Sequence, residues 1–311
     1  MFSMLVTGYL FLGGVGGGAL VVLSALECAN VRSRWPGPPA EPLRLERALR
    51  LPNEFFARAW PVCAVSLAAG MLCLLADLGR PDRVINLLVT PTPSAVAVGA
   101  YALAASLACS CAFAWLALSD GPNPRRGAAA ALAATGVASG LVTVTYAGVL
   151  LQSLASVLFW NTPLLPALFA LSALSCGAAC VFLAAGFTEA RFPAGPPVAH
   201  VARADGVLVA VEALCLAAYL AWALGGEGTA PAAEALVAGE LAPLFWGGVA
   251  ACGLAVPFVL ERFLVRDGRR SQMLGTAACL LAGGFALRCC MVGVAVYDVT
   301  QMPGALFGLA M

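Results

Sequence analysis

The chain has 311 residues, of which 61% are hydrophobic and only 11% are charged, and its formal net charge is +1 at pH 7. Soluble domains carry roughly one quarter charged residues, so this composition excludes a soluble globular protein and predicts a polytopic protein of the lipid bilayer. The near-zero net charge also argues against a nucleic-acid partner.

Eight apolar runs are long enough to cross a hydrocarbon core of about 30 Å. In chain order they are predicted at residues 5–26, 60–76, 95–118, 127–151, 164–187, 207–224, 241–260 and 273–296. Helices that share one bilayer can pack as a single bundle, so we predict an all-α integral membrane protein with one transmembrane domain over residues 1–311. The first run is longer than a signal-peptide core and no basic residue precedes it, which indicates a retained span.

Small residues are concentrated in the first run, where Gly13, Gly14, Gly16, Gly17 and Gly18 follow one another closely. Small side chains let two helix backbones approach closely within a bilayer. We therefore expect the first helix to pack against other helices rather than against lipid alone.

Arginine accounts for all 17 basic residues, and most of these arginines follow the odd-numbered spans, within residues 32–58, 125–126, 191–203 and 262–270. The other loops contain only Arg80 and Arg83. Because basic residues are enriched in cytoplasmic loops, this asymmetry predicts a multi-pass protein of the cell (cytoplasmic or inner) membrane with both termini outside.

The second span ends in a charged segment that contains Asp77, Arg80, Asp82 and Arg83. At the rim of a bilayer such groups must face protein, water or a partner, because hydrocarbon offers them no hydrogen bonds. The alternative is a charged loop that only anchors the helix end.

The only histidine is His200, whereas a transmembrane b-type haem normally takes paired axial histidines, so we expect no haem in this protein. The twelve cysteines form no CxxC motif and lie almost wholly in apolar runs, so we expect core packing and no iron–sulfur cluster. No zinc or P-loop pattern is present either. If the protein handles electrons, they must pass to a partner.

Four polar residues fall at similar depths when each helix is taken to rise 1.5 Å per residue. Tyr9 lies in the outer third of the first span, Asp77 closes the second, Tyr146 lies near the outer end of the fourth, and Arg288 lies in the outer half of the last. We predict that they converge on one outward pocket, with Asp77 as the acid nearest in depth to Arg288. The alternative for each tyrosine is the aromatic belt at the membrane interface.

Three further acidic residues are predicted in the cytoplasmic half of the bundle. Glu212 is about 10 Å into the sixth span from Asp205, and Glu27 and Glu261 end the first and seventh spans. An ionisable side chain inside a membrane marks a functional site by default, so Glu212 and Glu27 are candidates for proton transfer together with Asp77 and Arg288. A structural ion pair of Glu212 with Arg203 or Arg58 is the alternative.

Five motifs carry a resemblance to a known family. They are DLGRP at 77–81 followed by Asn86–Leu88, YAGVLL at 146–151, FWNTPLLP at 159–166, GGFALR at 283–288 and YLFLGG at 9–14. In this order they resemble the NrfD family, which includes the membrane subunit of polysulfide reductase, and the likeness covers nearly all eight spans.

The resemblance implies a membrane subunit that binds a quinone, menaquinone above all, near the outer face. It also implies an iron–sulfur subunit with ferredoxin-like clusters docked on that face, and a catalytic subunit that is often a molybdopterin enzyme. Tyr146 matches the family tyrosine associated with the quinone head group, and we predict Tyr9, Asp77 and Arg80 beside it. Some members place His and Asn near the start of the first helix, where this protein has Ser3, Thr7 and Tyr9.

The predicted function is therefore quinol or quinone binding with electron exchange to the iron–sulfur partner, with proton transfer, in a subunit that does not carry the catalytic centre of its complex. Membrane acids and arginines also build the sites of secondary transporters, although the two halves of the sequence show no clear repeat. A passive membrane anchor is the third alternative.

Overall fold

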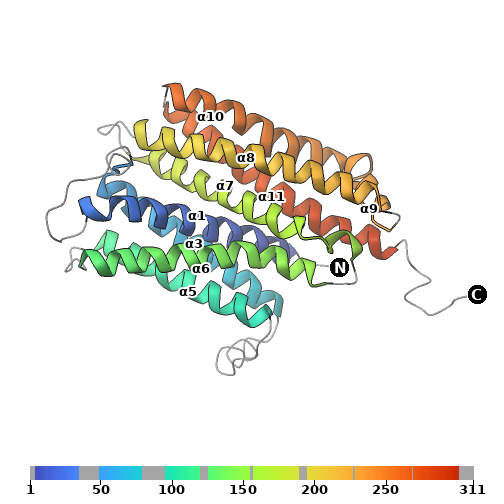
Figure 1. Cartoon of the computed structure of the whole chain (residues 1–311), viewed down its shortest axis with the longest axis horizontal. Coiled ribbons are helices and arrows are strands. Elements are labelled where there is room, and N and C mark those ends of the chain that lie inside the picture. The colour runs from blue at the N-terminus through green and yellow to red at the C-terminus, as the bar shows by residue number, and fades with distance from the viewer. Residues whose placement is uncertain are drawn as a thin grey trace, which may run out of the picture.

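We describe the protein from a computed structural model, in which residues 4–34, 49–78, 95–119, 125–154, 157–188, 195–226, 228–267 and 269–300 are described. Helices account for most of these residues (Figure 1). They are α1 (Met4–Arg34), α3 (Asn53–Leu78), α5 (Ala95–Leu118), α6 (Arg126–Gln152), η1 (Leu158–Trp160), α7 (Leu164–Phe187), α8 (Gly195–Leu224), α9 (Ala230–Val237), η2 (Leu244–Ala255), α10 (Val256–Asp267) and α11 (Arg270–Thr300).

Eight helices in the described ranges are long and apolar enough to cross a membrane, with η2 and α10 together forming the seventh. This confirms the predicted all-α integral membrane fold. Two helices begin ahead of their apolar runs, α3 at Asn53 and α8 at Gly195. Charged residues such as Arg58 and Asp205 lower the local hydropathy without ending a helix, so hydropathy alone places these starts too late.

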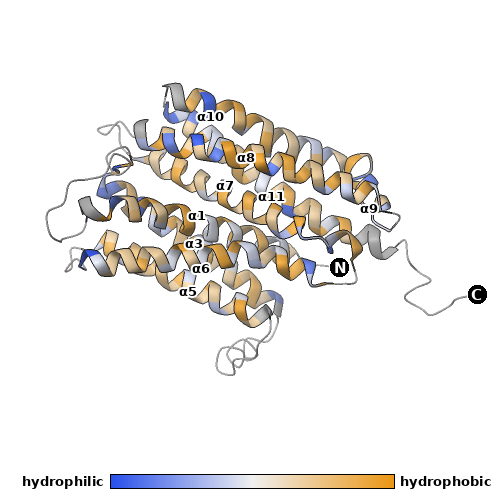
Figure 2. Cartoon of the chain, in the orientation of Figure 1, coloured by the Kyte–Doolittle hydropathy of each residue, from blue (hydrophilic) through white to orange (hydrophobic). Residues whose placement is uncertain are grey.

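The bundle has two ends (Figure 1). The start of α1, the end of α11 and the short helix α9 lie at one, here called the N-terminal end, and the end of α1 and the start of α11 lie at the other, the opposite end. Apolar residues cover the helices along their length, and hydrophilic residues gather near the two ends (Figure 2). Such a surface fits a bilayer, and the assignment of the N-terminal end to the outside stays a prediction.

Helices α1 and α7 form the centre of the bundle. In each, 72% of the most apolar window is buried inside the protein, against 22–33% in α3, α5, α6, α8 and the η2–α10 helix. Figure 1 shows α1 and α7 between α8 and α10 on one side and α5 and α6 on the other. The predicted packing of the first helix against other helices is confirmed.

The glycines of α1 explain this central position, because consecutive glycines face different helices. A Cβ atom on Gly16 would meet Leu67 of α3, and one on Gly17 would meet Val144 of α6. At Gly18 it would lie 1.8 Å from the carbonyl oxygen of Ala173 in α7. Three neighbours thus approach α1 at a distance that only small residues permit.

The seventh span is irregular, since residues 244–255 form a π-helix that continues into α10. Pro257 follows directly and has no N–H to donate. The π-helix packs backbone against backbone on α11, where a Cβ on Gly283 would lie 2.0 Å from the Cα of Gly253. π-helices are rare, and the short π-bulges found in other proteins often lie at functional sites. The residues around this π-helix are therefore candidates for a functional role.

We predict that Gly18→Ala destabilises the protein by about 1–3 kcal/mol or more, because the added methyl group collides with a backbone oxygen that cannot move freely. Thermal unfolding of the purified protein in detergent measures this effect. The matched control is Gly275→Ala in α11, where a Cβ atom meets nothing within 4 Å. Equal melting temperatures for the two variants would contradict the close α1–α7 crossing.

Candidate functional site

Tyr146 borders a groove between α5 and α6 near the N-terminal end. The groove has a volume of about 430 Å³ and is lined by Val98, Leu141, Val142, Thr145, Tyr146 and Val149. Its walls are thus almost wholly apolar, and the phenol of Tyr146 is the largest polar group in it. The ring lies directly over α5, because a Cβ on Gly99 would be 2.1 Å from its Cζ atom. Gly99 therefore makes the space in which this ring sits.

Tyr9 of α1 lies near Tyr146 but is not among the residues that line the groove. Its side chain is buried, its ring packs over Gly13 of its own helix, and its phenol is near enough to that of Tyr146 for the two to interact electrostatically. The two tyrosines come from α1 and α6, which pack closely together. The structure thus brings together two of the predicted site residues.

Two motifs fix the junction between α6 and α7 that follows Tyr146. A Cβ on Gly148 would lie 2.4 Å from the Cα of Pro166, so the two backbones touch there. In the η1 turn, the indole Nε1 of Trp160 donates a 2.9 Å hydrogen bond to the carbonyl of Met291, and the Tyr219 hydroxyl donates a 2.6 Å bond to the carbonyl of Phe159. The turn is therefore held to α8 and α11.

Arg288 lies at the centre of the bundle with only 1% of its surface exposed. Its Nη1 donates hydrogen bonds to Ser172 Oγ at 2.8 Å and to the carbonyl of Gly284 at 2.7 Å. The guanidinium also lies 5.4 Å from the ring centroid of Phe169 and directly against Gly14 of α1. These contacts hold a cation in a region where an unsatisfied one would be very costly.

Glu212 is an acid that interacts with this cation. Its side chain is buried, the Ser172 hydroxyl faces its carboxyl group, and it experiences the charge of Arg288. The predicted proximity of Arg288 to Asp77 is therefore wrong. Depth along a helix does not tell which way a side chain points, and Arg288 points to α7 and α8.

Asp77 is exposed at the end of α3 and does not join the Arg288 cluster. Arg80 lies outside the described residues. Of the four residues predicted to converge, Tyr9 and Tyr146 lie together, Arg288 lies deeper against Gly14, and Asp77 lies at the rim.

Glu27 belongs to a separate cluster at the opposite end. Its carboxylate forms an ion pair with Arg34, which also donates a 3.0 Å hydrogen bond from Nε to Asn53 and lies 4.0 Å from the ring centroid of Phe56. Burial lowers the pKa of Arg34, and the Glu27 carboxylate opposes that shift. This pairing favours a structural role for Glu27, which joins the end of α1 to the start of α3.

A third group of buried acids and hydroxyls lies between α7, α8 and α10, and its proximity was not predicted from the sequence. Ser175 of α7 donates a 2.6 Å hydrogen bond to Asp205 of α8, and Glu261 of α10 lies beside Asp205. The sequence analysis used Asp205 only as the inner end of the sixth span and assigned it no partner, whereas α8 begins ten residues earlier, at Gly195. The one available signal was the spacing of Ser172 and Ser175, which puts both hydroxyls on one face of α7.

Within the described ranges, no three His, Cys, Asp or Glu residues gather in a way that would hold a metal ion. The expected absence of haem and iron–sulfur clusters in this protein stays a prediction. The described sites instead offer phenols, carboxyls and hydroxyls, which are groups that bind and move protons, together with the guanidinium groups of Arg34 and Arg288.

Comparisons with known proteins match the whole length of the bundle. Residues 1–297 match the family described as "NrfD: Polysulphide reductase, NrfD". The C subunit of polysulfide reductase from Wolinella succinogenes is 30% identical over 303 residues, which cover 90% of this protein and 89% of that one. Protein NrfD of Escherichia coli (strain K12) is 34% identical over 145 residues, and this match spans about half of each protein (46%).

We predict that Arg288→Met lowers stability by about 3 kcal/mol, because it removes the cation beside the buried Glu212 carboxyl and leaves Ser172 without its donor. The measurement is thermal unfolding in mild detergent. Arg269→Met, which removes an exposed arginine just before α11, is the control. A melting temperature for Arg288→Met equal to that of the control would show that the cluster contributes nothing to the fold.

Proposed function

The protein belongs to the NrfD family, and on this premise we propose that it is the quinone-binding membrane subunit of an oxidoreductase complex. The observation that carries the proposal is the position of the Tyr146 phenol, at an apolar groove that opens between two membrane-spanning helices and next to a second buried phenol. A quinone combines a polar ring with an apolar tail, and this groove offers the matching surfaces.

The chemistry of the groove fits a quinone head group. Its volume of about 430 Å³ takes a ring and the first part of a tail, and Val98, Leu141 and Val149 supply apolar contact. Tyr146 is the only large side chain there that both donates and accepts a hydrogen bond, so we assign it to one ring oxygen. We propose Tyr9, whose buried phenol lies near that of Tyr146, as a second member of the site, and menaquinone is the quinone that we expect.

A quinone carries two electrons and two protons between its oxidised and reduced forms. The protons must move through residues of this protein, and Tyr146, which can donate and accept a proton, starts that path. We propose exposed Asp77 at the rim as an acceptor toward the N-terminal end, and buried Glu212 beside Arg288 as an acceptor in the interior. Arg288 remains charged and fixes the orientation of the groups around it.

We propose that the electrons pass between the quinone and partner proteins. One relative is named as the C subunit of polysulfide reductase, so we propose that this protein also works with other subunits. The expected partners are an iron–sulfur subunit with ferredoxin-like clusters on the N-terminal end, which we propose faces the outside of the cytoplasmic membrane, and a catalytic subunit of the molybdopterin class.

We predict that Tyr146→Phe in the intact complex weakens quinone affinity or lowers quinone-linked turnover by about 10- to 100-fold, which is the effect of leaving one buried hydrogen-bonding group unpaired. The measurement is quinone titration of the purified complex together with steady-state turnover. Tyr101→Phe on the neighbouring helix α5 is the matched control, because Tyr101 is exposed and does not line the groove.

The outcomes separate the alternatives. If Tyr146→Phe behaves like Tyr101→Phe, the assigned groove is wrong. If the complex extracts no quinone from the membrane, the subunit is a passive anchor. If vesicles that contain the protein accumulate a solute while quinone has no effect, it is a transporter.

A further inference from the structure

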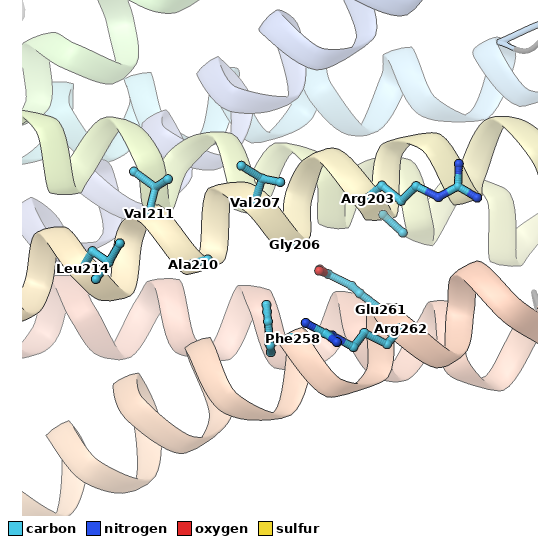
Figure 3. A pocket seen from close by; sticks show the side chains of 10 residues that line it. Arg203, Gly206, Val207, Ala210, Val211, Leu214, Phe258, Glu261 and Arg262 are labelled. Atoms are coloured by element: carbon cyan, nitrogen blue, oxygen red, sulfur yellow. The ribbon is translucent and has the colours of Figure 1, made fainter.

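Asp205 and Glu261 are two buried acids that face each other, and no cation in the described part of the protein forms an ion pair with either of them. Asp205 is 1% exposed and Glu261 is 2% exposed. They come from α8 and α10, and their carboxyl groups lie within interaction distance. Figure 3 shows the Glu261 side chain extending from α10 toward Gly206 on α8.

Three oxygens of this pair have no hydrogen-bond donor in the described part of the protein. They are Asp205 Oδ2 and both Glu261 Oε atoms, whereas Asp205 Oδ1 accepts from Ser175. Two ionised carboxylates buried at this separation repel each other, and each leaves oxygens unsatisfied. One proton placed between them removes a charge and supplies the missing donor.

The surrounding charged side chains that the structure describes form no ion pair with Asp205 or Glu261. Among the side chains that the structure describes, the other charged or titratable groups on the packed helices are His200, Arg203 and Glu212 on α8, Arg262 on α10, and Arg270 and Arg288 on α11. Arg203 and Arg262 are exposed, and Arg262 turns toward Phe258 at 4.6 Å from its ring centroid (Figure 3). On the remaining neighbours, α7 contributes Cys176 and Cys180, and Glu27 of α1 is paired with Arg34.

The pair lies between two grooves at the opposite end of the bundle. Glu261 lines a groove of about 660 Å³ between α8 and α10, together with Arg203, Gly206 and Arg262 (Figure 3). Asp205 lines another groove of about 410 Å³ on the far side of α8, together with His200. Each acid is therefore buried, and each lies at the wall of a space that opens out of the bundle.

The pair is also connected to the interior. Ser175 links Asp205 to α7, and Ser172 lies one turn further along α7, next to Glu212 and Arg288. A cavity of about 10 Å³ is lined by Ser172, Ser175 and Glu212 and bordered by the π-helix at Gly253. This is about the room that one water molecule needs, and the three side chains supply its hydrogen-bond partners.

We infer that Asp205 and Glu261 form a shared-proton site, which exchanges protons with the grooves at the opposite end and passes them through Ser175 and a bridging water to Glu212. Each step breaks one O–H bond and forms another, and no electron moves along this path. The use of the path rests on the proposed quinone chemistry, in which Glu212 takes up or releases protons as the quinone is reduced or oxidised.

The first test is infrared spectroscopy of the purified complex, which resolves the C=O stretch of a protonated carboxylic acid. Asp205→Asn and Glu261→Gln should each remove a protonated-carboxyl band that the wild type shows, and Ser175→Ala should shift this band without removing it. The control is Glu54→Gln, which replaces an exposed acid in the first turn of α3. If the spectra of both variants keep every protonated-carboxyl band that the wild type shows, the inference is overturned.

These variants keep the test decisive. Asn and Gln are neutral and have nearly the same shape as the protonated acids, so folding should be retained. If one variant does not fold, the other and Ser175→Ala still decide whether the band belongs to this pair.

The second test separates this inference from the proposed function. In proteoliposomes with the full complex, Asp205→Asn and Glu261→Gln should slow quinone-linked proton uptake at least about 10-fold, while quinone affinity stays unchanged. If the wild-type complex shows no quinone turnover, the proposed function fails. If it turns over and both variants match the wild type in rate and proton uptake, the relay fails and the proposed function stands.

Discussion

The interior of this protein depends on the burial of one guanidinium at the centre of the helix bundle, with only 1% of its surface exposed. Arg288 finds a hydroxyl on α7 and a carbonyl on its own helix, and Gly14 leaves the space that its other nitrogen occupies. In a bilayer each such group must be satisfied inside the protein. Gly14 of α1 and Arg288 of α11 therefore depend on each other, because α1 can pass Arg288 only where it carries no side chain.

The polar groups lie in two separate parts of the bundle. Tyr9 and Tyr146 lie together near the N-terminal end, against a groove of apolar residues. Asp205 and Glu261 lie near the opposite end, and Glu212 lies between them and Arg288. We propose that the quinone binds beside the two tyrosines, and that the buried acids supply or remove its protons. The π-helix borders the cavity that joins the acids to Glu212.

The sequence was sufficient for the membrane fold, because the thickness of the hydrocarbon core imposes a length on every span that hydropathy detects directly. It was also sufficient to bring Tyr9 and Tyr146 to one depth. It was not sufficient to pair Arg288, because depth fixes a position along the helix and leaves its direction around the axis open. The contact of Asp205 with Ser175 and Glu261 was missed for the same reason, because hydropathy does not show which neighbours a helix faces. Arg80 lies outside the described residues, so its assignment stays a prediction.

The central claim is that the head group of a quinone binds at Tyr146, in the groove between α5 and α6. The most direct measurement is a high-resolution cryo-electron microscopy map of the complete complex with a quinone analogue bound. Our account predicts density for the ring within hydrogen-bonding distance of the Tyr146 hydroxyl, with the tail leaving the bundle along Val98 and Val149. Density for the ring elsewhere, for example between α8 and α10, with only lipid beside Tyr146, would contradict it.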